Sequence, residues 1–524
     1  MRKIVAVIIA LIVVIAIAAP YGMGILAKKK VVAMLERSGH NPNVSVIMTQ
    51  YERGWFESNA DLDVQLILPP LANLTQGNSF TLAFKVKEHI IHGPIVFSRK
   101  GIKLGLAFVE SHVELDPMAK ALVEGIFKGQ KSRPQIDADT LFHLTGSTTS
   151  YLTVPPYLYQ NNHLLIHWKG LNGKWCFSGN YDGVSADTHF AGLVGSIPQA
   201  KLLVGAFDSK SRMQRSDHGL WTGTNKISLN KFALDIAGTH KIQLDNMSFN
   251  VSSNLNNQLF STTFGAEMKQ LQWNGRSFGP GRYKIEVSNL DAKALAQIHQ
   301  VIDASANLSP ELKQQRLASL AGVWLRLIAR GAKLDIQDVR LTMPEGNFLA
   351  NGSLGLDVAK PNDDDKGLIG MIQRVNANVN VEMPVIVAER IITELFFRHY
   401  QRQQSLQGIL INQLRKNDPN GAAAEPQQLG QAVPLTPLQM RQLAKQDGQK
   451  QLTLWLERGL IKQEGNQYKL QATLNKGELK VNGKVMNELS PIKAIPQVPT
   501  PATPMTGVIP VKPKAEDKPA VSAQ

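Results

Sequence analysis

The N-terminal stretch from Ile4 to Ala27 constrains this chain more than any other feature, because its 24 residues are mostly apolar and carry no charge. Three basic residues follow it directly: Lys28, Lys29 and Lys30. A helix rises about 1.5 Å per residue, so this stretch would reach about 36 Å, enough for the ~30 Å hydrocarbon core of a membrane. The sequence therefore predicts an N-terminal transmembrane helix and lysines that contact lipid headgroups.

Two questions about this stretch stay open at the level of the sequence. Ala16-Ile17-Ala18 has the small-x-small form of a signal-peptide cleavage site. The apolar run continues beyond that site to Ala27, which favours an uncleaved anchor over a cleaved signal peptide. Basic residues lie on both sides of the run, so counting charges does not decide its orientation.

The composition of the 524-residue chain is that of a globular protein, with 43% hydrophobic and 19% charged residues. Its mean hydropathy of −0.14 excludes a polytopic membrane protein. The net charge of +15 is scattered, and aromatic residues are few, which argues against nucleic acid and favours an anionic partner such as acidic lipid. Because Cys176 is the only cysteine, an intramolecular disulfide and a multi-cysteine metal site are excluded.

The body of the chain is dominated by segments in which apolar and polar residues alternate, the pattern of a half-buried β-strand. In the first of them, Ala60, Leu62 and Val64 fall on one face, with Asp61 and Asp63 on the other. The alternation recurs in four further segments: 80–86, 102–108, 375–383 and 468–474. These amphipathic strands predict an antiparallel sheet with one apolar face and one wet face.

Four later strand-like segments share a defect in this alternation: 227–234, 242–249, 285–292 and 334–341. In the second, the apolar positions shift phase at Asn246, and in the first Lys231 occupies the slip position. A β-bulge inserts one residue into a strand and bends it. The sequence therefore predicts a long, curved antiparallel sheet with bulged repeats, the alternative being chance similarity among short amphipathic strings.

Helices interrupt these strands in a few places. Asp116-Pro117, Ser309-Pro310 and Thr436-Pro437 each place a capping residue before a proline, and Pro384 opens a further helical segment. We predict helices over four ranges, packed on the sheet: 116–127, 309–331, 384–414 and 436–459. The fold class is accordingly mainly β with α insertions (α+β), following an N-terminal transmembrane helix.

Composition divides the chain into four regions. We predict a membrane anchor with a short helix at 1–39, an N-terminal β-rich region at 40–220 and a C-terminal β-rich region with helical insertions at 221–490. Residues 491–524 contain eight prolines and no periodicity. This tail is predicted to be disordered or extended, as a spacer or a partner-binding arm.

Patterns for catalysis or metal binding are weak. His163 and His167 lie four apart in a strand-like context without a carboxylate at ligand spacing. Ser228 and Lys231 formally match the Ser-x-x-Lys nucleophile pattern, but they lie inside an alternating strand rather than at the start of a helix. We find no Gly-x-Ser-x-Gly motif and no phosphate-binding loop. We therefore expect a non-enzymatic protein with no cofactor, no metal site and no catalytic residues.

The densest unusual stretch lies just before the first alternating strand and contains Arg53, Trp55 and Phe56. These three residues are the candidate binding site, for a lipid headgroup or a partner protein. The alternative is structural: Trp55 and Phe56 fill one end of the apolar face of the sheet, and Gly54 supplies the bend.

At this stretch the chain resembles the YdgA/YihF-type bacterial envelope proteins, a family of unknown function. The resemblance rests on four motifs: Tyr51-x-Arg53-Gly54-Trp55-Phe56-x-Ser58, His92-Gly93-Pro94, Gly219-Leu220-Trp221 and Leu479-Lys480-Val481-Asn482-Gly483. It covers most of the chain up to about residue 490. The resemblance implies a single-pass anchor in a Gram-negative inner membrane with the body in the periplasm, and it brings no catalytic residues.

Three hypotheses for function follow. The first is a non-enzymatic protein that binds or passes lipid or lipoprotein segments along the apolar face of a curved sheet. The second is an envelope scaffold that recruits partner proteins through its Pro-rich tail, and the third is a hydrolase of envelope polymers. The expected partners are membrane lipid and envelope proteins or lipoproteins, not nucleic acid. The sequence does not predict the oligomeric state.

Overall fold

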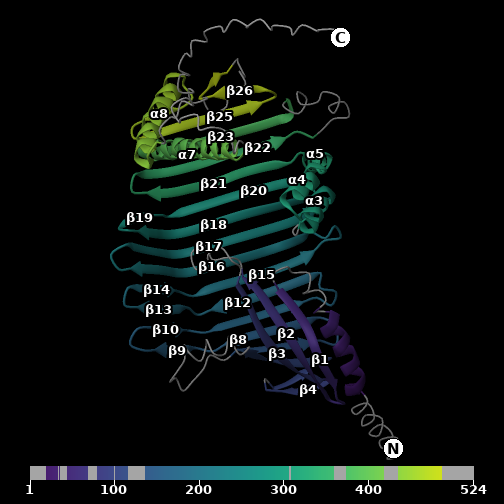
Figure 1. The fold of residues 1–524 in the computed structure, drawn as a ribbon. Helices are drawn as coiled ribbons and strands as arrows, with labels where there is room; N and C mark the ends of the chain where they lie inside the picture. Colours follow the sequence, from purple (N-terminus) through teal and green to yellow (C-terminus); the bar gives the residue numbers. More distant parts are fainter. Residues whose placement is uncertain are drawn as a thin grey trace, which may run out of the picture.

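A single antiparallel sheet of 25 strands dominates the protein, and it is accompanied by a separate two-stranded hairpin. The computed structural model describes these residues: 19–33, 35, 44–68, 80–99, 101–115, 136–305, 308–358, 373–417 and 435–486. Figure 1 shows the strands stacked one after another along the length of the molecule, in nearly the order of the sequence. The predicted mainly β fold with a long antiparallel sheet and a few helices is confirmed.

The sheet begins with a regular series of strands near the N-terminus. They are β1 (Val44–Arg53), β2 (Glu57–Leu68), β3 (Phe80–His92), β6 (Ala107–Leu115), β7 (Asp137–Phe142) and β8 (Thr148–Val154), each paired with the next. Between β3 and β6, the chain forms the separate hairpin of β4 (Ile95–Ser98) and β5 (Gly101–Leu104). The segment 102–108 was predicted as one strand, and that prediction is wrong, because the chain turns at Gly105 between β5 and β6.

The central part of the sheet is built from long strands, several of which are broken into two parts. These strands are β9 (Tyr157–Gln160), β10 (Leu165–Trp168), β11 (Leu171–Phe177), β12 (Gly183–Phe190), β13 (Leu193–Ile197), β14 (Ala200–Val204), β15 (Phe207–Arg215), β16 (Trp221–Ile236), β17 (His240–Asn256), β18 (Leu259–Trp273), β19 (Arg276–Phe278) and β20 (Gly281–Asp291). For example, β10 and β11 follow each other along one line, and β12 and β13 follow along the neighbouring line.

The C-terminal part completes the sheet and carries most of the helices. Its strands are β21 (Lys333–Met343), β22 (Gly346–Leu356), β23 (Val375–Pro384), β24 (Lys462–Glu464), β25 (Gln467–Asn475), β26 (Glu478–Val481) and β27 (Lys484–Val485). The helices are α3 (Ala292–Ala304), α4 (Pro310–Ala318), α5 (Ala321–Ile328), α7 (Val385–Asn417) and α8 (Pro437–Glu457). The predicted start signals act as caps: the side chains of Ser309 and Thr436 each accept a backbone hydrogen bond.

Three helix predictions have different outcomes. The helices predicted from Pro384 and Thr436 are confirmed as α7 and α8. The helix predicted over 309–331 is divided into α4 and α5, because the chain turns at Ser319 and Leu320. The helix predicted over 116–127 and the tail 491–524 lie outside the described residues.

A helix over residues 19–33 precedes the sheet and packs on it (Figure 1). Its Ala27 and Val31 are buried against Ala60, Ile90 and other residues of the first strands. Among the helices that the structure describes, none is both long enough and apolar enough to cross a membrane. The C-terminal end of the predicted span is therefore in contact with protein, and the rest of the span, residues 4–18, lies outside the described residues.

The breaks and phase slips of the central strands line up in a row across the sheet, which we call the seam. It passes through the strand breaks at 155–156, 169–170, 191–192, 205–206 and 279–280, and through three residues skipped in the pairing: Asn230, Asn246 and Lys269. Asn246 has a positive φ of 47°, as a residue in the left-handed region does. The phase slip predicted at Asn246 is confirmed, whereas in β16 the skipped residue is Asn230 rather than Lys231.

Candidate binding groove

The apolar side chains of the central strands lie in two rows, one on each side of the seam. The first row crosses ten neighbouring strands by direct pairing: Val154, Leu171, Phe190, Phe207, Leu229, Met247, Met268, Gly281, Leu341 and Phe348. Gly281 is the only member without a side chain. Neighbouring strands lie about 4.8 Å apart, so this row is about 43 Å long.

The second row lies on the other side of the seam and is also unbroken. It consists of Tyr157, Trp168, Leu193, Val204, Phe232, Leu244, Leu271 and Phe278. The rings of Trp168 and Phe190, one from each row, have their centroids 4.7 Å apart. The inserted residue at the seam therefore keeps both rows on one face, which we call the apolar face.

The opposite face of the same strands is polar. A row there contains Thr153, Asn172, His189, Asp208, Ser228, Ser248, Glu267, Arg282 and Arg340, directly paired from strand to strand. Ion pairs join some of these neighbours, such as Arg282 and Glu267 at 3.1 Å. The two-residue period of a strand explains this separation, because Ser228 and Leu229 must point to opposite sides of the sheet.

Side chains on the apolar face of the central sheet are only partly covered. None of residues 221–290, all of which the structure describes, is fully buried, and Phe249 remains 43% exposed. Every member of the two apolar rows is partly exposed. Between Trp221 and Leu290 the sheet is thus only partly covered in the part of the protein that the structure describes: Leu255, Phe260 and Leu290 pack against α3 and α5, and the two apolar rows stay partly exposed.

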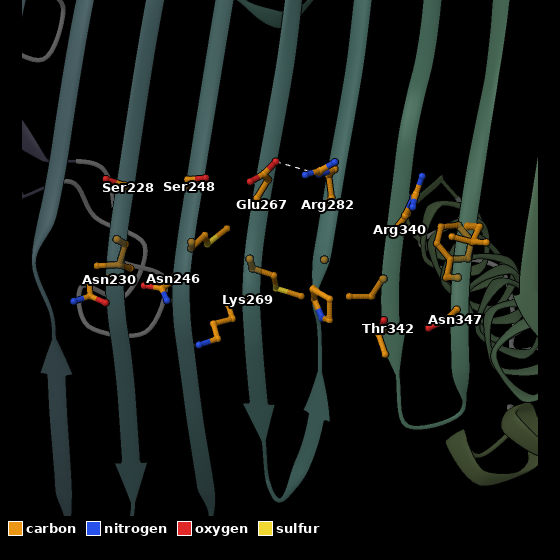
Figure 2. Close-up of a pocket in the computed structure, with 18 of the residues that line it drawn as sticks. Ser228, Asn230, Asn246, Ser248, Glu267, Lys269, Arg282, Arg340, Thr342 and Asn347 are labelled. Carbon is orange, nitrogen blue, oxygen red and sulfur yellow. Dashed lines mark ion pairs between the residues drawn. The ribbon is translucent and has the colours of Figure 1, made fainter.

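A hollow of about 860 Å³ lies on the seam and crosses strands β15 to β22. Its lining combines three groups: members of the first apolar row, such as Leu229 and Phe348; members of the polar-face row, such as Ser228 and Glu267; and the skipped residues Asn230, Asn246 and Lys269. Figure 2 shows the polar side chains of this region in two lines, with the apolar ones drawn between them. The interruption of strand pairing at the seam therefore coincides with a concave surface lined by both apolar and polar residues.

The apolar face leads into an apolar pocket at its C-terminal end. A third row lies beside the first apolar row on the same face and crosses eight strands without a break. It consists of Ile227, Phe249, Ala266, Tyr283, Val339, Ala350, Val381 and Leu470. Its last two members line a pocket of about 210 Å³ beneath α7, together with Met383, Ile391 and Trp455. α8 closes this end by packing Leu452 against Ile392 and Tyr468.

The helix of residues 19–33 covers the apolar face at its other end. Ala60 belongs to the same face as Ile227, because successive pairings connect the two through Glu88, Ser111 and Leu152. Burial raises the pKa of the Glu88 carboxyl above its ordinary value, although Ser111 donates a 2.7 Å hydrogen bond to it. The exposed apolar face thus lies between the N-terminal helix and α7–α8.

The structure brings the predicted residues Arg53 and Trp55 together on the N-terminal helix. The Arg53 guanidinium donates a 2.6 Å hydrogen bond to the Tyr21 hydroxyl and lies 4.5 Å from the centre of its ring. The indole of Trp55 contacts the same ring at 4.9 Å. Phe56 does not join this cluster and is 55% exposed. Arg53 and Trp55 therefore hold the helix, a role that the sequence did not indicate.

His92 packs against the same helix, and it was not predicted as a site residue. It is buried, its Nδ1 lies 3.1 Å from the Trp55 carbonyl, and its Nε2 lies 2.8 Å from the Ser58 hydroxyl. The carbonyl can only accept, so Nδ1 carries the proton and Ser58 donates to Nε2. Burial lowers the pKa of His92, which keeps the ring neutral. The His92-Gly93-Pro94 motif was the only signal in the sequence.

Glycines allow the close contacts around this histidine. A Cβ added at Gly24 of the helix would lie 2.3 Å from the His92 ring, and one added at Gly93 would lie 1.8 Å from the Gly105 carbonyl oxygen. Neither position can hold a larger side chain without movement of its neighbours. The motifs around residues 51–58 and 92–94 thus meet at the His92 ring, which lies against Gly24.

The three lysines after the predicted span have different environments. The Lys30 ammonium donates hydrogen bonds of 3.2 Å to the carbonyls of Gly146 and Gly179, in turns of the sheet. Lys28 lies over the Tyr51 ring at 4.7 Å, and Lys29 is exposed. Lys30 is therefore bound to the protein itself, which the predicted contact with headgroups did not anticipate.

Metal-binding geometry is not found among the described residues, where no three His, Cys, Asp or Glu side chains converge. His163 and His167 lie before and within β10, and neither approaches such a group. Ser228 and Lys231, the formal nucleophile pattern, lie in β16 as the alternation predicted, and the Lys231 ammonium is 3.9 Å from Asp245.

The chain belongs to a family of bacterial proteins of unknown function, DUF945, whose profile matches residues 1–488. The match includes the N-terminal stretch, the sheet and all the described helices. No curated protein and no solved structure matches the chain. The family therefore assigns neither a ligand nor an activity to the apolar face or to the cluster around His92.

Proposed function

We propose that the protein is a non-enzymatic, membrane-anchored protein that binds lipid acyl chains, or the lipid-modified segment of a lipoprotein, along its apolar face. The observation that carries the proposal is the pair of unbroken apolar rows that flank the seam, on a face that the described residues leave partly exposed. An elongated apolar surface about 43 Å long has room for extended acyl chains along it and is a poor fit to a compact soluble ligand.

The ends of the apolar face support the same proposal. The pocket beneath α7, lined by Met383 and Trp455, has almost no polar lining and continues the row that contains Phe249. At the other end, the helix of residues 19–33 leads towards the uncharged stretch from Ile4. A ligand released from a membrane at the N-terminal end would have the apolar rows of the central strands, and then the pocket, on the same face of the sheet.

The proposed location follows from the residues outside the described part and from the resemblance to YdgA/YihF-type proteins. We propose that the uncharged stretch from Ile4 anchors the protein in the bacterial inner membrane and that the sheet lies in the periplasm. The scaffold hypothesis depends on the tail 491–524, which lies outside the described residues, and it stays a prediction. The hydrolase hypothesis also stays a prediction.

Photocrosslinking in cells tests the proposed ligand. A photoreactive phenylalanine analogue is placed at Phe249, on the apolar face, and in a matched variant at its neighbour Asn250, on the polar face. Both positions are exposed, so only the face differs. We expect lipid or lipoprotein adducts from position 249 and none from position 250. Equal yields, or adducts at 249 with only the protein's own chain, would contradict the proposal.

A further inference from the structure

The short hairpin of β4 and β5 exposes four large apolar side chains on one of its faces. Its inner face buries Val96 against Phe108 and Leu141 of the main sheet. Its outer face carries four large side chains that pair across the two strands, Ile95 with Leu104 and Phe97 with Ile102. They are 52%, 68%, 71% and 68% exposed, respectively.

This outer face lies at the same end of the molecule as the N-terminal helix. The hairpin follows directly from His92, whose ring contacts Gly24 of the helix and whose backbone N–H donates to the Phe56 carbonyl. Figure 1 shows β4 beside the lower end of that helix. Trp55 and Phe56, in the turn between β1 and β2, add two more exposed aromatic side chains there.

The chain before the described helix indicates what covers this surface. The first described residue is residue 19, and the preceding residues from Ile4 onward carry no charge. If they enter a bilayer, as proposed above, the bilayer surface lies within a few residues of Tyr21, and Tyr21 contacts Trp55. The hairpin therefore lies where an amphipathic element can insert its apolar side into the acyl boundary, to a depth of about 5–10 Å.

We infer that the β4–β5 hairpin is a second membrane contact, which inserts Phe97 and Ile102 into the lipid bilayer beside the anchor. The inference rests on the proposed membrane attachment of residues 1–18. Two contacts fix the orientation of a body that a single helix would leave free to rotate. The hairpin would thereby direct the N-terminal end of the apolar face towards the bilayer.

Fluorescence quenching by lipids tests this inference in the full-length protein. Cys176→Ser removes the native thiol, and an environment-sensitive fluorophore is attached to single cysteines made by Phe97→Cys, Ile302→Cys or Ile12→Cys. The proteins are reconstituted into vesicles of phosphatidylethanolamine and phosphatidylglycerol whose acyl chains carry bromine. Ile302 is a matched control, because it lies in α3, far from the N-terminal end, and is 50% exposed.

We expect about a twofold loss of fluorescence at position 97, within the depth that interfacial elements reach, and none at position 302. Quenching at position 12 without quenching at 97 would overturn the hairpin contact and leave the anchor in place. Quenching at 97 without quenching at 12 would support the hairpin and contradict the anchor. If the fluorophore at position 97 becomes shielded from water only at high protein concentration, a second copy of the chain covers the hairpin. That result would also overturn the inference.

Discussion

Strands β1 to β8, with the helix and the hairpin packed on them, form what we call the N-terminal layer. This layer and the central strands belong to one continuous sheet, but their apolar side chains are covered to different extents. In the N-terminal layer, the helix of residues 19–33 covers one face, and the hairpin packs Val96 against the other. In the central sheet, from Trp221 to Leu290, no described residue is fully buried. The first region therefore resembles an ordinary protein core, whereas the second leaves most of its apolar side chains partly exposed.

This difference in burial predicts which regions of the molecule are the most stable. Buried apolar area is the main favourable term in folding, so the N-terminal layer and the helix-covered C-terminal end should be the most stable parts. The central sheet depends on backbone hydrogen bonds and on cross-strand contacts between partly exposed side chains, such as Met247 with Met268. Substitutions of the same chemical type should then have very different effects in the two regions.

The largest contrast is expected between two phenylalanines. Phe142 is 1% exposed in the N-terminal core, and Phe249 is 43% exposed on the apolar face. Phe142→Ala should lower the local free energy of unfolding by about 3–5 kcal/mol, because it leaves a cavity. Phe249→Ala should change it by less than about 1 kcal/mol. Amide hydrogen exchange of the surrounding strands measures both, and equal losses of protection would remove the distinction between the two regions.

A smaller effect is expected at the contact between the helix and His92. A Cβ at Gly24 has no space beside the His92 ring, whereas one at Gly22 meets nothing within 4 Å. Gly24→Ala should destabilise the docked helix by about 1–3 kcal/mol through overpacking. Gly22→Ala should stabilise it by up to about 1 kcal/mol, because alanine favours helix. Hydrogen exchange over residues 19–33 gives the sign, and the same sign for both variants would contradict this packing.

The smallest effect is a pH dependence of the same contact. Burial lowers the pKa of His92 in the folded protein, so the unfolded chain binds the proton more tightly. The contribution of His92 to stability is therefore complete above its ordinary pKa of about 6.5 and is lost as the pH falls below it. The raised pKa of Glu88 acts in the opposite direction, at pH values above its ordinary range.

The His92 contribution is isolated by comparison with a variant that cannot titrate. Protection of residues 19–33 against exchange should fall between pH 7.5 and pH 5 in the parent protein, after correction for the intrinsic exchange rates. It should fall less in His92→Gln, which keeps a polar side chain at this position. Identical pH profiles for the two proteins would show that His92 does not control the docking of the helix.

Much of the architecture could be predicted because a strand has a period of two residues. The alternation around Leu62 and Val379 identified strands, and the phase slip at Asn246 identified an irregularity in a long sheet. The alignment of such irregularities across many strands could not be predicted, since it depends on pairing between residues that are distant in sequence. The positive φ values at Gly170, Gly192 and Asn246 are a partial signal, because Gly and Asn adopt them readily.

The candidate site was predicted less well than the fold. Arg53 and Trp55 were selected for their unusual density, but their partner Tyr21 was assigned to the predicted membrane span. Hydropathy alone could not show that the end of this span packs on protein, because an apolar side chain fits a protein core as well as a bilayer. The contact of Gly24 with His92 joins two motifs that lie far apart in the sequence.

The central claim is that the apolar face, and not the polar face, holds lipid. The most direct test is the amount of lipid that co-purifies with the full-length protein, measured by mass spectrometry for Met247→Glu and Ser248→Glu. These neighbours in β17 point to opposite faces, and both are partly exposed. Met247→Glu should remove most of the bound lipid, and Ser248→Glu should leave it unchanged. Equal lipid content in the two variants would contradict the account.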